Sequence, residues 1–351
     1  MKLMKSTTTR PIRLKDIATR AEISVAAVSM ALADHPDIST ETKRQVRELS
    51  QVLGYRRAGV YMKGESTQRR LERIGLVFIG GRSAVQPHSI LPRALARQAQ
   101  QNNFRLEIID IESIEDPGQV IEQTVNFGKM LDGLIISGYA DERLLEALNE
   151  KNIPCVIIGH ILLNDADLGR IHRVGHTVAS DEMYASQAVV GRLIELGHRR
   201  IAFASENAPR GLCHWQWLMG YKLALMEHGQ TIDPQLIAIT GRKFAGPQIV
   251  QQFSALGDPP TAYLVPDITT AHSLVQAHAA AFPDAGPLHK SLICGGNPEM
   301  LEIFGMNDYP VVMENADMLV TAAVNRLAEL RMNPLPQPTQ LTIAPIMLNF
   351  P

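Results

Sequence analysis

The segment from Leu14 to Tyr55 limits the fold of this chain more than any other part of the sequence. Apolar residues recur at helical spacing in Leu14–Ala21 and again in Val25–Leu32, with a short turn between the two stretches. Ser24 is a favourable N-cap for the second stretch, because its hydroxyl can accept a hydrogen bond from a backbone N–H of the first turn. A third amphipathic stretch, 39–54, begins at a serine and ends at a glycine. Two short helices, a tight turn and a third supporting helix predict a helix-turn-helix unit.

The charge of the chain is unevenly distributed. Residues 1–73 contain 15 Lys and Arg against 8 Asp and Glu, a balance of +7. The chain as a whole has 34 basic and 36 acidic residues, which leaves 19 and 28 for the remainder, a balance of −9. A basic N-terminal segment on an acidic body suits phosphate binding at one end of the protein.

Beyond residue 73, apolar segments with strand character alternate with helical segments. The predicted strands are Ile74–Ile79, Leu106–Ile109, Gly133–Ile136, Cys155–Ile158, Ile201–Ala204, Ala262–Val265 and Leu292–Cys294. The predicted helices lie near 88–101, 118–129, 141–150, 180–196, 215–228, 245–255 and 269–281. This alternation predicts parallel sheets with crossover helices, and the strands are too many for one compact sheet of this type. We therefore expect two similar α/β subdomains.

The N-terminal pattern resembles the DNA-binding headpiece of the lactose-repressor/galactose-repressor (LacI/GalR) family of bacterial transcription regulators. The residues that carry the resemblance are Asp16-Ile17-Ala18, Ala21, Ile23-Ser24, Val28-Ser29, Ile38-Ser39, Thr42, Val46 and Leu53-Gly54-Tyr55-Arg56. Landmarks in the body are Asp132–Ile135, Ile153–Ile158, Leu196–Ala202 and Gly220–Leu225. The resemblance implies an all-α helix-turn-helix headpiece and a periplasmic-binding-protein-like α/β body of two parallel-sheet subdomains.

The resemblance also implies a division of the chain. The helix-turn-helix domain would span residues 1–60, a hinge linker 61–73, and an effector-binding and dimerisation domain 74–351. In the family the chain crosses between the two subdomains three times. The expected boundaries are therefore about 74–175 plus 311–334 for subdomain one and about 176–310 plus 337–351 for subdomain two.

The start of the second helix is expected in the major groove of DNA. Met30 stands where many family members carry arginine, and Ala27 where many carry threonine. Arginine can hold guanine by two hydrogen bonds, whereas Val, Ala and Met contact only apolar features such as the thymine methyl group. Met30 either faces the groove or belongs to the core, and its position off the buried stripe favours the groove. The resemblance places Val25, Ala26 and Met30 at base-reading positions. It places Ser24, Ser29, Thr42 and Tyr55 at phosphate-contacting positions. Added contacts are expected from Lys15, His35, Arg56 and Arg57.

In the family the linker becomes a short hinge helix on DNA, with a leucine wedged into the minor groove. Here the usual Asn and Leu are missing, and Gly59 and Gly64 lower the helix propensity. We expect Val60 or Met62 to act as the wedge.

Family members bind a small effector, often a sugar or a nucleobase, between the two subdomains. Here Trp217 stands in place of a common arginine, and prolines 266 and 298 stand at positions that are usually polar. Two interpretations stay open: the ligand is changed or absent, or the loops are matched with a shift of one or two residues. A free pyranose would find few hydrogen-bond partners, so a flatter or more apolar ligand, or none, is expected. The candidate effector residues are His88, His160, Trp217, Asp267, Asn297 and Asn315.

Nothing in the sequence predicts catalysis or a cofactor. There is no P-loop, G-x-G-x-x-G, H-E-x-x-H or G-x-S-x-G motif. His172 and His176 are four residues apart, but glycines flank them, and a solvated pair is expected rather than a metal site. The three cysteines are far apart and indicate buried thiols. With no membrane span and no apolar signal segment, the expected location is the cytoplasm.

The sequence therefore predicts a sequence-specific DNA-binding transcription regulator, a repressor that binds a palindromic operator as a homodimer. The last ten residues read as a final strand without a heptad tail, which favours a dimer over a tetramer. One rival is a ligand-binding receptor with a vestigial headpiece. The other is an enzyme on the same α/β scaffold, which would rest on analogy of fold alone.

Overall fold

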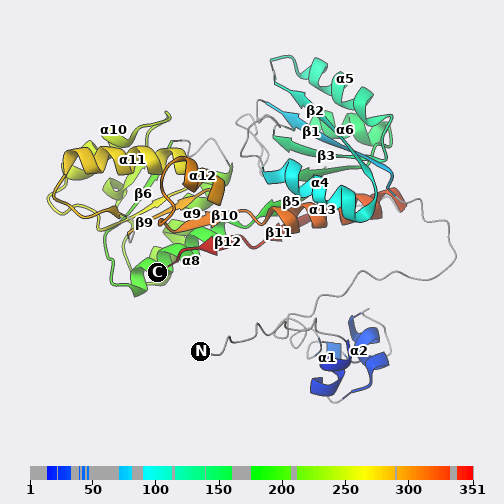
Figure 1. Cartoon of the computed structure of the whole chain (residues 1–351), viewed down its shortest axis with the longest axis horizontal. Helices are drawn as coiled ribbons and strands as arrows, with labels where there is room; N and C mark the ends of the chain where they lie inside the picture. The colour runs from blue at the N-terminus through cyan, green and yellow to red at the C-terminus, as the bar shows by residue number, and fades with distance from the viewer. Residues whose placement is uncertain are drawn as a thin grey trace, which may run out of the picture. The chain divides into compact units, whose positions relative to one another are not determined.

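The structure is a computed structural model, shown in Figure 1. It describes residues 14–21, 23–32, 39, 42–43, 46, 71–80, 90–112, 115–138, 140–159, 175–206, 212–288, 291–332 and 338–350. The chain divides into two compact units, residues 1–67 and residues 68–351. The predicted hinge linker lies outside the described residues except at its end, where Arg73 already belongs to the first strand.

The N-terminal unit begins with the two predicted helices, α1 (Leu14–Ala21) and α2 (Val25–Leu32). The backbone N–H of Ala27 donates to Ser24 Oγ at 3.0 Å, which confirms Ser24 as the N-cap of α2. In the same way Thr42 N–H donates to Ser39 Oγ at 3.1 Å, at the start of the third helical segment. The buried residues are Ala18, Ala21, Val28, Ala31 and Val46, as the helical spacing predicts.

In the described part of the unit 68–351, the strands form two six-stranded sheets, each covered by helices on both faces (Figure 1). The first sheet has the order β11-β5-β4-β3-β1-β2 and is parallel throughout. Its strands are β1 (Arg73–Ile79), β2 (Arg105–Ile111), β3 (Gly133–Gly138), β4 (Cys155–Ile158), β5 (His176–Ser180) and β11 (Gln340–Ile343). Its helices are α4 (Ile90–Asn102), α5 (Pro117–Gly128), α6 (Glu142–Glu150) and α13 (Ala316–Met332). We call this assembly the first lobe.

The second lobe is built on the sheet β12-β10-β9-β8-β6-β7, in which only β12 is antiparallel to its neighbour. Its strands are β6 (Ile201–Ser205), β7 (Ile237–Ile239), β8 (Ala262–Val265), β9 (Leu292–Gly295), β10 (Val311–Met313) and β12 (Ile346–Leu348). Its helices are α8 (Glu182–Glu195), α9 (Leu212–Glu227), α10 (Gly246–Ser254), α11 (Ile268–Ala281) and α12 (Pro298–Ile303), with a short 3-10 turn, η1 (Pro234–Leu236).

Alternation along the central strands explains why each sheet has two hydrophobic cores. In β1, Ile74, Leu76 and Phe78 pack in the core beneath α4 and α13, whereas Val77 and Ile79 pack on the opposite face beneath α5 and α6. The second lobe repeats this arrangement, with α8 and α9 on one face and α10, α11 and α12 on the other. Continuous apolar runs are therefore expected in these strands, because both of their faces are buried.

The seven predicted strands and seven predicted helices are all present, but the predicted boundaries between the subdomains are wrong. β5 belongs to the first sheet although residues 176–180 were expected in subdomain two. β10 belongs to the second sheet although 311–313 were expected in subdomain one, and β11 returns to the first sheet. These strands are three to five residues long and carry no extended apolar run, so their sequence gives little strand signal.

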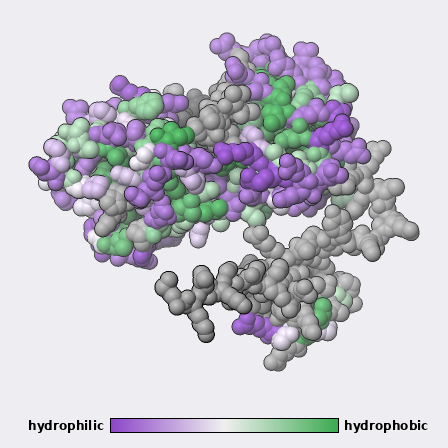
Figure 2. Space-filling view, in the orientation of Figure 1, coloured by the Kyte–Doolittle hydropathy of each residue, from purple (hydrophilic) through white to green (hydrophobic). Residues whose placement is uncertain are grey.

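The predicted single C-terminal strand is two strands in different sheets. β11 ends at Ile343 in the first lobe, and β12 begins at Ile346 in the second. The chain thus crosses between the lobes at Ser180–Glu182, at Met313–Ala316 and at Ile343–Ile346. On the face of the body seen in Figure 2, hydrophilic residues dominate and apolar residues occur in separate patches. None of the described helices is long and apolar enough to span a bilayer.

The contact between α8 and α9 gives a prediction about stability. A Cβ atom added at Gly220 would overlap the backbone carbonyl oxygen of Met183 on α8, so the two helices would have to separate. Gly220→Ala should therefore destabilise the body by roughly 1–3 kcal/mol, the usual cost of overpacking. The control is Gly257→Ala, because a Cβ there meets open space. Equal urea midpoints for the two variants would contradict this account.

Candidate functional site: an interlobe cleft and a helix-turn-helix surface

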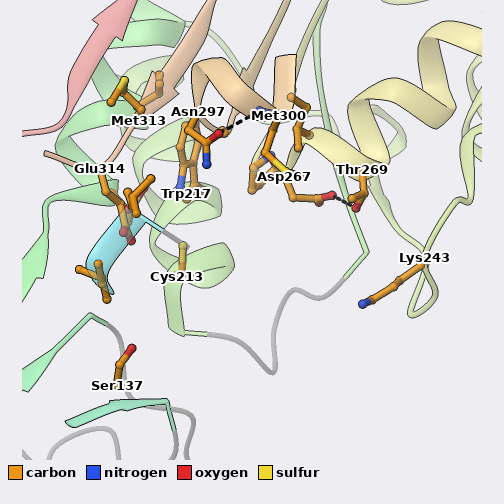
Figure 3. Close-up of a pocket in the computed structure, with 18 of the residues that line it drawn as sticks. Ser137, Cys213, Trp217, Lys243, Asp267, Thr269, Asn297, Met300, Met313 and Glu314 are labelled. Atoms are coloured by element: carbon orange, nitrogen blue, oxygen red, sulfur yellow. Dashed lines mark hydrogen bonds between the residues drawn. The ribbon is translucent and has the colours of Figure 1, made fainter. Parts of the chain in front are cut away.

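The two lobes enclose a cleft of about 560 Å³ at the carboxyl ends of their parallel strands (Figure 3). The ends of β1 and β3 contribute Phe78 and Ser137 from the first lobe. The second lobe contributes residues that follow β8, β9 and β10 and residues from the start of α9. Ligands of open α/β sheets bind at this edge, because the loops and helix N-termini gather there. The lining residues include Ile90, Leu91, Glu182, Cys213, Trp217, Lys243, Asp267, Thr269, Asn297, Met300, Met313 and Glu314.

Glu182 is the most deeply buried carboxyl group of this cleft. It is the first residue of α8, directly after the first crossing, and is 5% exposed. Its pKa is raised to about 8, chiefly by burial and in addition by the nearby carboxylates of Glu314 and Asp181. The neighbouring side chains of Ser180 and Trp217 act in the opposite direction and lower this pKa. Glu182 therefore keeps its proton at neutral pH.

A second acidic group lies at the end of β8. Asp267 caps α11, with Oδ1 accepting from Thr270 N–H at 2.7 Å and from the Thr269 hydroxyl at 2.7 Å. Its other oxygen, Oδ2, is buried and has no hydrogen-bond partner among the described residues. Burial and the Asp267 carboxylate raise the pKa of Glu206, whereas the Lys243 ammonium group lowers it. The charge of Lys243 thus acts at the Asp267 end of the cleft.

Three of the six predicted effector residues line this cleft. They are Trp217, Asp267 and Asn297. The Trp217 side chain is 2% exposed, and Asn297 caps α12 by accepting a hydrogen bond from Met300 N–H at 2.9 Å. Asn315 caps α13 through Met318 N–H at 3.2 Å and is not among the residues that line the cleft, so its role as an effector residue stays a prediction. His88 and His160 lie outside the described residues.

Sequence reasoning missed the two glutamates. Glu182 and Glu314 each follow a short strand, β5 or β10, that the sequence pattern did not predict. Without those strands neither residue could be placed at a crossing between the lobes. Glu314 directly follows the apolar triplet Val311–Met313, which would have been the signal to look for there. Glu182 follows Ser180 and Asp181 and carries no comparable signal.

In the headpiece, α2 presents the predicted recognition surface. Val25 is 44% exposed at its start, and Ala27 and Met30 are half-buried. Met30 therefore belongs neither to the buried core nor to a fully exposed face. Ser24 is exposed, and its hydroxyl is used by the cap of α2, while the Thr42 hydroxyl lies 2.8 Å from Ser39 Oγ. The other predicted DNA-contacting residues lie outside the part of the chain that the structure describes. They are the side chains of Lys15, Ala26 and Ser29 and the whole of His35, Tyr55, Arg56, Arg57, Val60 and Met62.

The comparison with family models assigns the N-terminal unit. Residues 13–58 match the model of the LacI family of bacterial regulatory proteins. The match to a curated transcriptional repressor extends over 267 residues, which is 75% of this chain. The chain belongs to the LacI family. As a member of that family it is a transcriptional regulator with a helix-turn-helix DNA-binding domain.

Curated relatives of this LacI-family chain are named as regulators and repressors. The transcriptional repressor CytR of Escherichia coli K12 is 27% identical over 267 residues, which cover 75% of this chain and 74% of that protein. Catabolite control protein A of Priestia megaterium is 26% identical and covers 72% and 73%. These names agree with the prediction of a regulator rather than an enzyme.

Solved structures of the LacI family confirm the predicted fold. The transcriptional regulator CelR in complex with cellobiose has a TM-score of 0.62 at 17% identity and covers 97% of this chain and 98% of that one. The Lac repressor bound to ONPG has a TM-score of 0.62 at 18% identity with the same coverage.

The buried Glu182 carboxyl group makes a pH-dependent prediction. In the unfolded chain this group ionises near its ordinary pKa of 4.5, but in the folded protein it holds its proton up to about pH 8. Between these values the folded state binds more protons, so this group makes stability fall as pH rises. Glu182→Gln removes the effect. Because one pKa unit corresponds to about 1.4 kcal/mol, the variant should gain up to a few kcal/mol relative to the wild type across this window.

The measurement is the urea midpoint at several pH values from about 5 to about 9. Glu302→Gln is the control, since Glu302 is exposed on α12 and does not line the cleft. Its pH profile should run parallel to that of the wild type. A parallel profile for Glu182→Gln as well would show that Glu182 does not titrate abnormally.

Proposed function

We propose that this regulator binds a palindromic operator as a homodimer in the cytoplasm, represses transcription, and responds to a small molecule in the interlobe cleft. The observation that carries the proposal is a capped helix-turn-helix pair on a chain whose body encloses a cleft of about 560 Å³. A volume of this size suits a small organic ligand. Operator binding and ligand binding among the structural relatives, such as the Lac repressor dimer bound to operator, support the same assignment.

In this proposal α2 reads DNA by apolar contact. The helix sequence VAAVSMAL carries no charged side chain, and Val25 is exposed at its start. Apolar side chains in the major groove discriminate through the thymine methyl group. The proposed base contacts come from Val25, Ala26, Ala27 and Met30. The proposed phosphate contacts come from Lys15, Ser24, Ser29, His35, Thr42, Tyr55, Arg56 and Arg57. Val60 or Met62 is the proposed minor-groove wedge.

The alternative is a ligand-binding receptor whose headpiece no longer binds DNA. A gel shift with a pool of genomic fragments distinguishes the two functions, because a working headpiece should enrich a palindromic site. Sedimentation at micromolar concentration should show a dimer, since two headpieces related by a two-fold axis match a palindrome. A monomer that enriches no fragment would favour the receptor.

Met30 provides the sharper prediction about recognition. Met30→Arg should shift the base preference toward guanine at one position of each half-site, with a discrimination of roughly 1–3 kcal/mol. The measurement is selection from a randomised operator library with the full-length protein. An unchanged preferred sequence would place Met30 away from the bases.

Arg56→Ala serves as the contrasting variant. A phosphate contact carries no sequence information, so its loss should weaken binding to all sequences and lower the salt dependence. A change in preferred sequence in this variant would contradict the assignment of Arg56 to the backbone.

A further inference from the structure

We infer that the second lobe has a further ligand site, separate from the interlobe cleft, which takes a small neutral aromatic alcohol of the phenol class. The site is a cavity of about 310 Å³ between α10, α11 and the segment that leads into β8. The cleft lies at the carboxyl ends of the strands, whereas Pro259 and Pro260, which line this cavity, precede β8. The two sites are therefore at opposite ends of the second sheet.

Two helices form most of the wall of this cavity. α10 and α11 lie side by side on one face of the second sheet (Figure 1). Leu274, His278 and Phe282 recur every four residues along α11 and its C-cap, so they share one face of the helix. Val250 and Phe253 contribute from α10. The wall on this side is therefore mainly aromatic and branched apolar.

The opposite wall is held in place by Arg200. Its Nε donates to the backbone oxygen of Asp258 at 2.7 Å and lies 3.2 Å from the Asp258 carboxylate. The backbone oxygen of Arg200 accepts from Thr261 N–H at 2.8 Å. These contacts fix both ends of the segment that carries Pro259 and Pro260, and the proline rings restrict its backbone further. The wall is thus held against collapse, as in a preformed ligand pocket.

Tyr263 and His278 give the cavity two polar groups. Tyr263 is the second residue of β8 and is 7% exposed, and its ring packs against Phe253 with the centroids 6.1 Å apart. Its hydroxyl makes no hydrogen bond with the described residues. The His278 ring packs against Phe282 at 5.1 Å, and its nitrogens also lack a hydrogen-bond partner among the described residues. Because buried polar groups are normally hydrogen-bonded, the unpaired Tyr263 hydroxyl points to a ligand.

Both polar groups are uncharged at neutral pH. Burial lowers the pKa of His278 and raises the pKa of Tyr263. No Lys, Arg, Asp or Glu side chain is among the described residues that line the cavity. A charged ligand would lose its hydration without gaining an opposite charge, which is costly in an apolar site. The lining therefore selects a neutral molecule.

A phenol matches both polar groups. Its hydroxyl donates one hydrogen bond and accepts another, while a neutral imidazole and a tyrosine hydroxyl offer the complementary acceptor and donor. Its ring can pack against the aromatic side chains of the wall. Water fits less well, because a buried water needs two to four polar partners. A cavity of roughly 150 Å³ holds one benzene ring, so the volume of about 310 Å³ suits two fused rings.

The test is isothermal titration calorimetry on the full-length protein at neutral pH with ring-matched probes. The neutral alcohols are 2-naphthol and p-cresol, the probe without a hydroxyl is toluene, and the charged probes are 4-methylbenzoate and 4-methylbenzylamine. We expect p-cresol to bind about three- to tenfold more tightly than toluene, the usual contribution of a neutral hydrogen bond. 2-Naphthol should bind at least about tenfold more tightly than p-cresol, because its second ring buries more apolar area. Neither charged probe should bind at millimolar concentration.

Tyr263→Phe removes only the hydroxyl and keeps the ring that packs against Phe253. It should weaken p-cresol binding about three- to tenfold and leave toluene binding unchanged. Tyr184→Phe is the matched control, since Tyr184 is 54% exposed on α8 and does not line the cavity. This control should bind every probe as the wild type does.

His278→Phe and His272→Phe form a second matched pair on α11. Phenylalanine at 278 keeps an aromatic ring beside Phe282 but removes the acceptor, so p-cresol binding should again weaken about three- to tenfold. His272 packs against Phe304 and does not line the cavity, so its replacement should leave binding unchanged. The urea midpoint of each variant without a probe establishes that the variant is folded.

Three results would overturn the inference. The first is that neither p-cresol nor 2-naphthol binds, or that toluene binds as tightly as p-cresol. The second is that Tyr263→Phe and His278→Phe bind p-cresol as tightly as their controls do. The third is preferred binding of either charged probe. Retention of operator DNA in a gel shift is a separate measurement, because the proposed function does not require this cavity.

Discussion

The hydrogen-bonded contact among the three interlobe crossings is the constraint on which the rest of the body depends. Asp181 N–H donates to Ile343 O at 2.9 Å, and Met313 pairs with Ile346. Three adjacent backbones restrict how the two lobes can move. They also bring the carboxyl ends of both sheets toward one cleft, because each crossing enters or leaves a strand of a parallel sheet.

This arrangement couples the cleft to the relative position of the lobes. Glu182 and Glu314 lie on crossing segments, so a ligand that contacts them contacts the connection itself. Across the cleft, Arg93 of α4 and Glu299 of α12 form an ion pair at 3.0 Å with both side chains exposed. Exposed pairs of this kind contribute little and are screened by salt. A ligand with unequal affinity for two lobe arrangements could therefore change their populations, which is the requirement for control of DNA binding.

The headpiece and the cleft differ in how directly the sequence reveals them. The residues that define the headpiece are contiguous, and Ser24 and Ser39 cap their helices within three residues. The residues of the cleft come from strand ends far apart in the chain, from Phe78 to Glu314. Local sequence patterns were enough to predict the headpiece, whereas predicting the cleft would have required the order of the strands in the two sheets.

The sequence by itself determined the helix-turn-helix unit, the central strands and most of the helices. Helical periodicity, caps and apolar runs are local signals, and residues such as Val28 and Ile74 are buried where those signals place them. Only the tertiary structure decided where the chain crosses between the lobes. β5, β10 and β11 are too short to show a periodic hydrophobic pattern, and they are recognised as strands only by their pairing with distant strands. It also decided the chemistry of the cleft. Asn315, a plausible ligand residue in the sequence, caps a helix, while Glu182 and Glu314 line one cleft only because separate crossings lie side by side.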